Sequence, residues 1–559
     1  MDWEIVIFFG ALIAIALYVM YDTGRKNKAK LEKKLRESFG KMSTKQYSDD
    51  EYELISHFYE DTSGDCNVVD DITWNDLGMD SVFKSMNICN SSAGQECLYK
   101  MLRCPSDDVN KLKETDRLAK FFAANQDKRL NIQRLFAKLG IVRHISLSDY
   151  LGLITELKSG SNVFHYLINV LLIVAFVVCF AIDAAIGVGL IVVAISISVT
   201  SYYKYKAKVE SYFVCITQLV RIVDAAKSVA ALKYEELDSY NKRLKEITDD
   251  FSTITKNSSL ISSGNVNGSM AEMVLEYMRM LTHIDLIKFN NMVKHLGDRE
   301  AVMYELMELL GYIEACISVA SFREALPYWC EPQLTNSGNT LDVKEAFHPL
   351  IAEPVANSIN AEKHVLLTGS NASGKSTFLK TIAINALLSQ TIYTSVSKEY
   401  KAAMFRIYSS MSLRDDLSNN NSYYIVEIKS LKRILDAVAK DSAMPVLCFV
   451  DEVLRGTNTV ERIAASSEIL KSLKFKNVLC FAATHDIELT TLLEKYYDNY
   501  HFQEEVTDDD VKFNYKLFKG PATTRNAIKL LNIIGYDKEV ISAAEKQAMY
   551  FMANGSWQN

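Results

Sequence analysis

Two long apolar runs stand out in the pattern of hydrophobic and polar positions. Residues 5–21, "IVIFFGALIAIALYVMY", contain no charged residue, and residues 163–203 form a second run of about 40 residues with one acid, Asp183, near its middle. A helix rises about 1.5 Å per residue, so about 20 apolar residues cross the hydrocarbon core of a membrane. The first run is therefore long enough for one crossing and the second for two.

The charges around these runs predict how the runs are placed in a membrane. A carboxylate at the centre of a bilayer costs at least about 2.5 kcal/mol, so we expect Asp183 at the tip of a hairpin formed by helices 163–182 and 184–203. Asp2 and Glu4 precede the first run, which favours a retained anchor over a cleaved signal peptide. The alternative is that the apolar helices are buried in a soluble core.

Lysine and arginine are distributed asymmetrically around the three predicted spans. "RKNKAKLEKKLR" follows the first span and "KYKAK" follows the third, whereas the chain start and the Asp183 tip carry neither residue type. Basic loops stay in the cytoplasm. We therefore expect a multi-pass protein of a bacterial inner (cytoplasmic) membrane, with its N-terminus outside and its large soluble parts in the cytoplasm.

Outside these runs, the first half of the chain has the spacing of helices. From about residue 72 to 160, apolar residues recur every three or four positions, which predicts a helical domain. The same spacing continues beyond the second run, so the third span is predicted to extend into a long cytoplasmic helix. Residues 256–269, "KNSSLISSGNVNGS", are predicted to form a loop.

The pattern changes from about residue 343 onward. Short β-branched runs such as "HVLLTG", "PVLCFVDE", "NVLCFAATH", "NYHFQEEV" and "FNYKLF" alternate with helical segments. This alternation predicts an α/β fold whose sheet has a largely parallel core and an antiparallel edge.

Composition narrows the classes of function. The chain has 559 residues, of which 49% are hydrophobic and 23% charged, as in an ordinary folded protein. The formal net charge of -7 argues against a protein that coats nucleic acid by bulk charge, so any DNA contact would be local. The 10 cysteines form no C-x-x-C pair, which predicts reduced thiols without a disulfide framework or a structural metal.

A nucleotide-binding loop is predicted directly after the strand "HVLLTG". Its sequence matches G-x-x-x-x-G-K-[ST] and precedes a helix, which is the context that this motif requires. We expect its backbone N–H groups to cradle the phosphates of ATP, Lys375 to reach the β- and γ-phosphates, and the Ser376 hydroxyl to bind Mg²⁺. The candidate cofactor-binding residues are Gly369, Ser370, Asn371, Ala372, Ser373, Gly374, Lys375, Ser376 and Thr377.

Three further residues are predicted at the same edge of the sheet. Asp451 and Glu452 end the strand "VLCFVDE", where Asp451 would orient the Mg²⁺ shell and Glu452 would act as general base on the attacking water. His485 ends the next strand, where it could sense the γ-phosphate. The alternatives are a simple acidic turn and a structural histidine. The predicted enzyme is a Mg²⁺-dependent ATP hydrolase, with Glu452, His485 and Lys375 as catalytic residues.

These motifs and their surroundings resemble the MutS family of DNA mismatch-repair ATPases. The most specific stretch is "FVDEVLRGTNTVERIAASSEIL", residues 449–470, which is similar to the family's acidic pair followed by a variant of G-R-G-T-S-T and a helix. Further similarities are "FHPLI", "TGSNASGKST", "ATH" and "FNYKLFKG". Glu461 stands where the family usually has glycine, and Ala372 and Ser373 replace its loop methionine and first tandem glycine.

The resemblance extends weakly over residues 72–550 and implies a partner subunit. MutS ATPase domains dimerise, and residues 415–435 resemble the loop that one subunit lends to the other, with Ser422 contacting the γ-phosphate in trans and Glu427 at the family's glutamate. A polar turn before a helix is the alternative. The resemblance also implies a core that lacks the mismatch-reading wedge and keeps only a short segment, about 250–300, where the DNA clamp would be.

The predicted organisation joins an α/β P-loop NTPase domain of ABC/MutS-like type to an all-α helical core and three transmembrane helices. The predicted segments are a membrane anchor (1–21), a basic stalk and linker (22–71), the first part of the helical core (72–162), a membrane hairpin (163–203), a lever-like second part of the core (204–335), and the ATPase domain with C-terminal dimerisation helices (336–559).

Two functions remain open at this point. One is a membrane-anchored ATPase that still engages double-stranded DNA. The other is an ATP-driven switch or scaffold that acts at the lipid bilayer on an unidentified protein partner. A homodimer is expected in either case.

Overall fold

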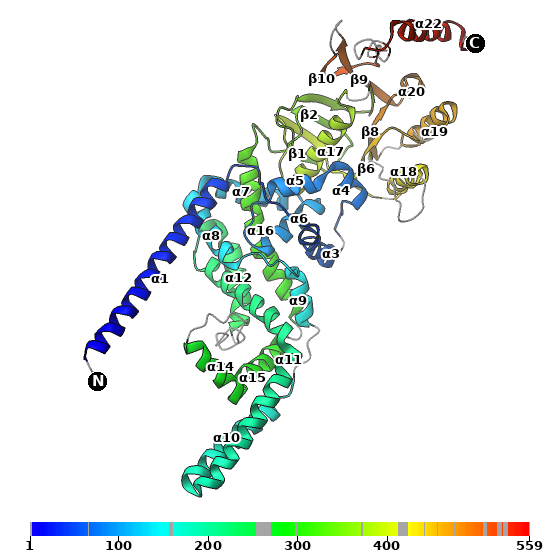
Figure 1. The fold of residues 1–559 in the computed structure, drawn as a ribbon. Coiled ribbons are helices and arrows are strands. Elements are labelled where there is room, and N and C mark those ends of the chain that lie inside the picture. Colours follow the sequence, from blue (N-terminus) through cyan, green and yellow to red (C-terminus); the bar gives the residue numbers. More distant parts are fainter. Residues whose placement is uncertain are drawn as a thin grey trace.

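The computed structural model describes most of the chain, and Figure 1 shows its course from the N-terminus to the C-terminus. The residues outside the description are 1–2, 65, 156–159, 253–269, 297–298, 371–372, 412–422, 441, 455–456, 475–476, 507–510, 523–527, 529–530, 532–534 and 558–559. The predicted loop 256–269 and Ser422 therefore lie outside the described residues.

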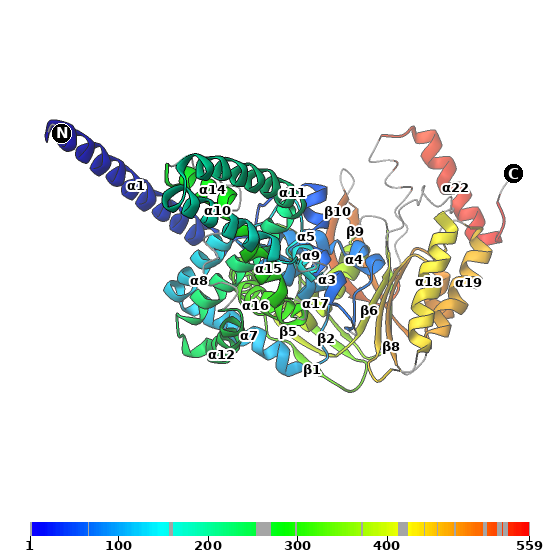
Figure 2. The ribbon, with the colours of Figure 1, turned by 90° about the horizontal axis from the view of Figure 1, so that it is seen from below.

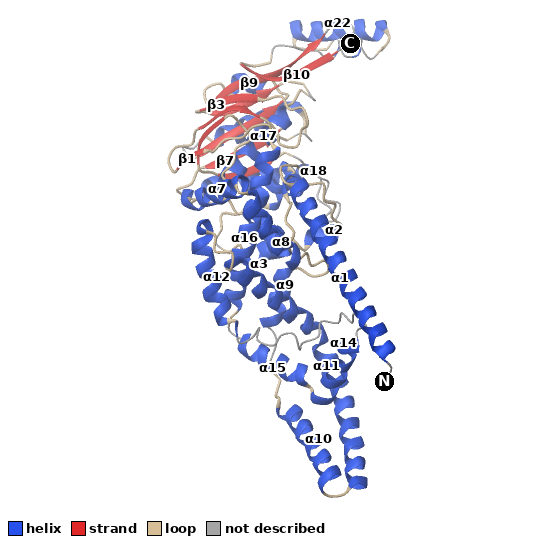
Figure 3. Ribbon diagram, turned by 90° about the vertical axis from the view of Figure 1, so that its left-hand side faces the viewer, coloured by secondary structure: helices blue, strands red, loops and turns tan. Residues whose placement is uncertain are grey.

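A long helical body carries the β-sheets at one end, and two helical projections leave it towards the other end (Figures 1 and 3). One projection is the N-terminal half of α1, and the other is the hairpin of α10 and α11. The helices that precede the hairpin are α1 (Trp3–Ser38), α2 (Asp49–Glu53), α3 (His57–Thr62), α4 (Asp71–Leu77), α5 (Met79–Met86), α6 (Ser92–Arg103), α7 (Val109–Ala124), α8 (Gln126–Leu139) and α9 (Leu147–Thr155).

The hairpin divides at Asp183, as its sequence predicts. Helix α10 spans Val163–Ala181, and α11 spans Ala184–Ala230. The Asp183 carboxylate caps α11 by accepting hydrogen bonds from the backbone N–H groups of Ala185 (2.8 Å) and Ile186 (3.0 Å). Helix α11 continues without a break for 47 residues from the hairpin tip into the helical body.

Two described helices are long and apolar enough to cross a membrane. They are Val163–Ala181 and Ala184–Glu210, and only 17% of the apolar window of each is buried by the rest of the protein. Most of each window is thus uncovered by the described protein, and insertion of these helices in a membrane stays a prediction. The third predicted span is the beginning of α1, which is helical, and its use as a span stays a prediction.

Beyond α11, four helices and one 3-10 turn complete the described part of the helical body. They are η1 (Glu235–Leu237), α12 (Asp238–Asp250), α14 (Met270–Thr282), α15 (Ile284–Leu296) and α16 (Glu300–Ala325). Helix α16 runs through the centre of the body and packs closely on α6. A Cβ atom on Gly94 of α6 would lie 2.1 Å from Glu314 Oε2, and one on Gly311 of α16 would lie 2.4 Å from the Ala93 carbonyl oxygen. Glycine at these two positions therefore permits the close crossing.

The crossing buries the carboxyl group of Glu314. Its Oε1 accepts a hydrogen bond from the Asn90 backbone N–H at 2.6 Å, and its Oε2 accepts one from the Ser91 hydroxyl. Burial raises the pKa of Glu314 from the ordinary 4.5 to about 7, although these hydrogen bonds and the nearby Lys45 act in the opposite direction.

We expect the free energy of unfolding to depend on pH through Glu314. The folded protein holds this proton more tightly than the unfolded chain, so stability is lost as pH rises from 4.5 to about 7 and the loss is complete above that value. The expected loss is on the order of 3 kcal/mol. Denaturant unfolding of the detergent-solubilised protein across this window would show it. Glu314→Gln should reduce the slope but not abolish it, because burial also raises the pKa of Glu96, to about 8. An equal slope in that variant would assign the dependence to other groups.

Two sheets form the C-terminal part. The larger has six strands in the order β10-β9-β4-β8-β7-β6, where β9 to β6 are mutually parallel and β10 is antiparallel to β9. Its strands are β4 (His364–Thr368), β6 (Arg406–Ser410), β7 (Val446–Asp451), β8 (Val478–Thr484), β9 (Tyr497–Val506) and β10 (Val511–Lys519). This pairing confirms the predicted parallel core with an antiparallel edge. The residues of β4, β7 and β8 are buried, as is typical of a parallel sheet that is covered on both faces.

The smaller sheet was not predicted. It has four strands in the order β1-β5-β2-β3. Its strands are β1 (Gln333–Thr335), β2 (Leu341–Ala346), β3 (Asn357–Ala361) and β5 (Glu399–Ala403), and the helices of this part are α17 (Lys375–Thr391), α18 (Tyr423–Ala439), α19 (Thr459–Ser472), α20 (Glu488–Leu492) and α22 (Lys538–Asn554). Helices α18 and α19 cover one side of the larger sheet, and α17 lies on the side that faces the helical body (Figure 2).

Candidate functional site

The register of the parallel strands gathers the predicted site residues at one edge of the larger sheet. Thr368 of β4 pairs with Thr484 of β8, and Asp451 of β7 pairs with Ala483. The residues that follow these strands therefore begin at the same level. This edge holds the loop after β4, the acidic pair at the end of β7, and His485.

The loop between β4 and α17 has the backbone that close phosphate binding requires. Gly369 and Gly374 have φ angles of +144° and +110°, a region that favours glycine. A Cβ atom on Gly369 would lie 2.6 Å from the Phe502 carbonyl oxygen, so a side chain does not fit there. Asn371 and Ala372 lie outside the described residues, and Ser370, Ser373 and Thr377 lie in the loop and at the start of α17.

The Lys375 ammonium group lies at the centre of the site. It donates hydrogen bonds to the carbonyl oxygens of Gly369 (2.8 Å) and Ser370 (2.9 Å), and it lies 3.4 Å from His485 Nε2. The residue is only 4% exposed. A lysine that is folded back on its own loop holds the loop closed, and it is within reach of any anion that the loop binds.

The hydroxyl of Ser376 and the carboxylate of Asp451 face each other. Ser376 Oγ donates a hydrogen bond to Asp451 Oδ2, and Asp451 is buried. Hydroxyl and carboxylate oxygens are the ligands that Mg²⁺ prefers in nucleotide sites. The donor set therefore fits the predicted metal.

Glu452 and His485 are in direct contact across the ends of two strands. Glu452 Oε1 lies 2.6 Å from His485 Nε2, so the histidine contacts both the acid and Lys375. The backbone at Glu452 has a φ of +59°, which is unusual for a residue with a side chain. Its N–H donates to the Ala483 carbonyl oxygen at 2.9 Å, which fixes the turn that points the carboxylate at the site.

Two contacts from α18 and α19 hold the segments that carry Glu452 and His485 in place. Arg462 of α19 binds Asp486 with distances of 2.6 and 2.9 Å, which anchors the residue directly after His485. The buried carboxylate of Glu427 in α18 accepts a hydrogen bond from the backbone N–H of Leu454, which itself has a φ of +60°. Glu427 thus holds the turn of the acidic pair within its own chain.

A cavity of about 650 Å³ opens beside the loop. Its walls combine Lys375, Ser376 and Glu452 with a set of residues whose role the sequence alone did not predict. These are His348, Ile351, Phe502 and Tyr515. Burial lowers the pKa of His348 to about 4, so its imidazole is neutral at physiological pH. The volume is that of a small-molecule site, and its apolar and aromatic wall suits a nucleotide base.

Another residue that sequence reasoning missed is Glu504 of β9. Its carboxylate accepts a hydrogen bond from the Ser370 hydroxyl at 2.9 Å and ties the loop to the neighbouring strand. The pattern "FQEEV" offered a signal, because alternation along β9 puts Phe502 and Glu504 on the same face of the sheet. Which face meets the loop depends on the strand order.

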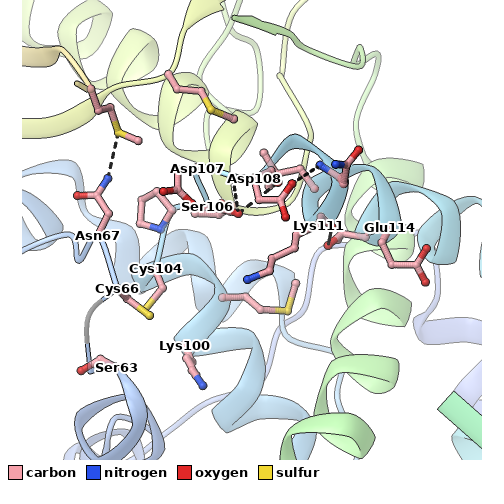
Figure 4. Close-up of a pocket in the computed structure, with 18 of the residues that line it drawn as sticks. Ser63, Cys66, Asn67, Lys100, Cys104, Ser106, Asp107, Asp108, Lys111 and Glu114 are labelled. Carbon is pink, nitrogen blue, oxygen red and sulfur yellow. Dashed lines mark hydrogen bonds between the residues drawn. The ribbon is translucent and has the colours of Figure 1, made fainter. Parts of the chain in front are cut away.

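A larger cavity, of about 1260 Å³, lies between the helical body and the sheet region (Figure 4). Lys111 and Glu114 of α7 line one side, and Cys66 and Cys104 lie together on another. Burial raises the pKa of the Cys104 thiol to about 12. None of the described lining residues belongs to the 369–377 loop, so this cavity marks the joint between the two parts and is separate from the nucleotide site.

The part of the chain that carries this site is also the part that matches a known family. The family description "MutS domain V" matches residues 365–552. The chain is 30% identical over 226 residues to the DNA mismatch repair protein MutS of Thermus aquaticus, covering 39% of this chain and 27% of that protein. It is 26% identical over 334 residues to the DNA mismatch repair protein MSH3 of Candida albicans, covering 54% and 31%. It is 29% identical over 317 residues to MutS protein homolog 4 of Mus musculus, covering 53% and 31%. The chain thus spans less than a third of the length of these relatives.

Proposed function

The chain belongs to the MutS family, and from that premise we propose that it is a membrane-anchored ATPase that binds ATP with Mg²⁺ and hydrolyses it. One observation carries the proposal. Lys375, Ser376, Asp451, Glu452 and His485 come from three separate segments and converge at one edge of the sheet, beside a cavity large enough for a nucleotide.

Each residue at this edge of the sheet has its own role in the proposed reaction. The loop N–H groups and the start of α17 would bind the phosphates, and Lys375 would exchange its two loop carbonyls for phosphate oxygens. Ser376 and Asp451 would hold Mg²⁺, which neutralises charge on the phosphates when bound. Glu452 would accept the proton of the attacking water, and His485 orients that carboxylate through the 2.6 Å contact.

The apolar helices support anchoring in a membrane. Helix α10 and the first part of α11 expose apolar side chains, and lysines follow this exposed part of α11. Together with the start of α1, they would give three spans, with the N-terminus outside and the ATPase part in the cytoplasm of a bacterial cell. The three proposed spans form the two projections, which leave the helical body towards the same end (Figure 3).

A homodimer forms part of the proposal, with Ser422 of each chain contacting the γ-phosphate bound by the other. Support comes from α22, which exposes several large apolar side chains. They are Val540, Met549, Tyr550 and Phe551. An exposed apolar helix face is typical of a surface that a second copy covers.

DNA is the first candidate for what the ATPase acts on, because relatives of this chain are named DNA mismatch repair proteins. The second candidate is an ATP-driven switch or scaffold with a protein partner at the bilayer. The continuity of α11 favours the second candidate: at about 1.5 Å per residue, its 47 residues link the hairpin to the helical body as one rigid rod.

The experiment that tests the proposal is ATP hydrolysis by the full-length protein in detergent. We expect Mg²⁺-dependent turnover that Lys375→Ala abolishes, since the variant loses the cation that binds the phosphates. Stimulation by duplex DNA that falls steeply with salt would support the DNA candidate, whereas turnover that is indifferent to DNA would favour the switch. Nucleotide binding without any turnover would leave a scaffold and overturn the enzymatic proposal.

A further inference from the structure

Among the described side chains of α14, residues 274–282, the buried one is charged and the exposed ones are apolar. Arg279 is 3% exposed, whereas Val274, Tyr277 and Met278 are 59%, 57% and 53% exposed. These three apolar residues lie at helical spacing on one face. A helix on a water-covered surface shows the opposite distribution.

The described charged residues of α14, Glu276 and Arg279, are paired on its inner side. Glu276 binds Lys206 of α11 at 2.9 Å and Arg279 at 3.1 Å, and the three side chains form one cluster between α14 and α11. The pairing compensates the charges within the protein. The outer face is thereby left with apolar side chains.

The end of α14 lies beside the two apolar helices rather than above them. The Ser198 hydroxyl of α11 hydrogen-bonds the carbonyl oxygens of Met280 (2.8 Å) and Leu281 (2.9 Å), and the Asn169 amide of α10 donates to the Thr282 carbonyl oxygen at 2.9 Å. Both Asn169 and Ser198 lie within the segments long and apolar enough to span. The last turn of α14 therefore lies at the level of Asn169 and Ser198, away from the Asp183 tip of the hairpin.

These bonds satisfy the carbonyl groups that every helix leaves unpaired at its C-terminus. The next residue, His283, ends the helix with a φ of +54°. Its Nε2 lies 2.9 Å from the Ser198 carbonyl oxygen, and its Nδ1 lies 2.8 Å from His165 Nδ1. Water would satisfy such groups on a soluble surface. In hydrocarbon, irregular backbone is tolerated only where protein groups replace water, and that is what Ser198 and Asn169 do here.

We propose that α14 is an interfacial membrane helix, with the phospholipid bilayer as its partner. Val274, Tyr277 and Met278 insert at the boundary between headgroups and acyl chains on the cytoplasmic side, continuous with the exposed face of the hairpin. The exposed Tyr166 and Tyr203 of the hairpin lie near the same level, as aromatic residues do at membrane interfaces. This inference rests on the proposed membrane insertion of α10 and α11.

The proposal also bears on the choice of partner. By their resemblance to the MutS family, residues of about 250–300 correspond in sequence to the DNA clamp. DNA phosphates are bound by lysine and arginine, but the outward residues of α14 are apolar. This helix therefore suits lipid better than DNA.

The test is quenching of a single introduced tryptophan by brominated lipids. Full-length protein carrying Trp3→Phe is reconstituted in nanodiscs of phosphatidylcholine and phosphatidylglycerol, with bromine either near the headgroup or deep in the acyl chain. Tyr277→Trp reports on α14, Phe176→Trp on α10, and Val460→Trp on an exposed position of α19 (76% exposed) in the ATPase part. Val274→Trp replaces Tyr277→Trp if the latter fails to fold.

We expect the emission added by Tyr277→Trp to be lost most strongly with shallow bromine, that of Phe176→Trp to be lost with deep bromine, and that of Val460→Trp to stay unchanged. If position 277 behaves like position 460 while position 176 is quenched, the inference about α14 is wrong and the membrane hairpin stands. If position 176 is not quenched either, the membrane anchoring itself is wrong. Covering of this face by a second copy would also leave position 277 unquenched, and it would overturn the inference in the same way.

Discussion

Replacing Glu452 by glutamine is expected to lower the kcat of ATP hydrolysis by about 10²- to 10⁴-fold, the usual contribution of a general base. Glutamine keeps the size of the side chain and its contact with His485, but it cannot accept the proton of the attacking water. The Lys375 and Ser376 side of the site is unchanged, so ATP should still bind with Mg²⁺. Such a variant accumulates the ATP-bound state.

The measurement is single-turnover hydrolysis beside equilibrium ATP binding, on the detergent-solubilised full chain. Glu461→Gln is the matched control, because Glu461 is an exposed acid of α19 that accepts a 3.3 Å hydrogen bond from the Thr457 hydroxyl. This control should leave kcat unchanged. Full turnover in Glu452→Gln would show that another group activates the water.

Replacing Arg323 by alanine is expected to destabilise the protein by about 3–5 kcal/mol, the cost of removing one partner of a buried ion pair. Arg323 is 4% exposed near the end of α16 and binds Asp116 of α7 at 2.7 Å. Its other nitrogens donate to Thr394 Oγ1 (2.8 Å) and to the carbonyl oxygens of Ile392 and Tyr393 (both 3.0 Å). One guanidinium thus joins two helices of the body to the segment that follows α17.

Thermal and denaturant unfolding of the solubilised protein would measure this loss. Arg117→Ala is the control, because Arg117 is exposed and pairs with Glu114 on the surface of the same α7, where ion pairs contribute at most about 1 kcal/mol. Equal unfolding midpoints for the two variants would contradict the role of Arg323 at this joint.

Local sequence determined most of the candidate nucleotide site at the edge of the larger sheet. A buried strand followed by glycine, lysine and serine admits few backbone courses, and the structure places Lys375, Ser376, Asp451, Glu452 and His485 together as the strand–turn pattern predicts. The break at Asp183 was also local, because one carboxylate in an apolar run decides where the helices end. The roles of these residues stay predictions that the experiments above test.

Tertiary structure decided what depends on contacts between distant segments. The strands of the second sheet, such as "NSINA" and "EYKAA", contain no apolar run of the kind that marks β4, β7 and β8 in the sequence. The cavity wall joins His348, which follows β2, to Tyr515 of β10, and only the packing of the two sheets brings these residues together. The pattern of α14 alone describes an ordinary amphipathic helix. Only its packing against α10 and α11 decides that the charged side faces inward and the apolar side outward, because a helix pattern defines two faces but not which one meets the protein.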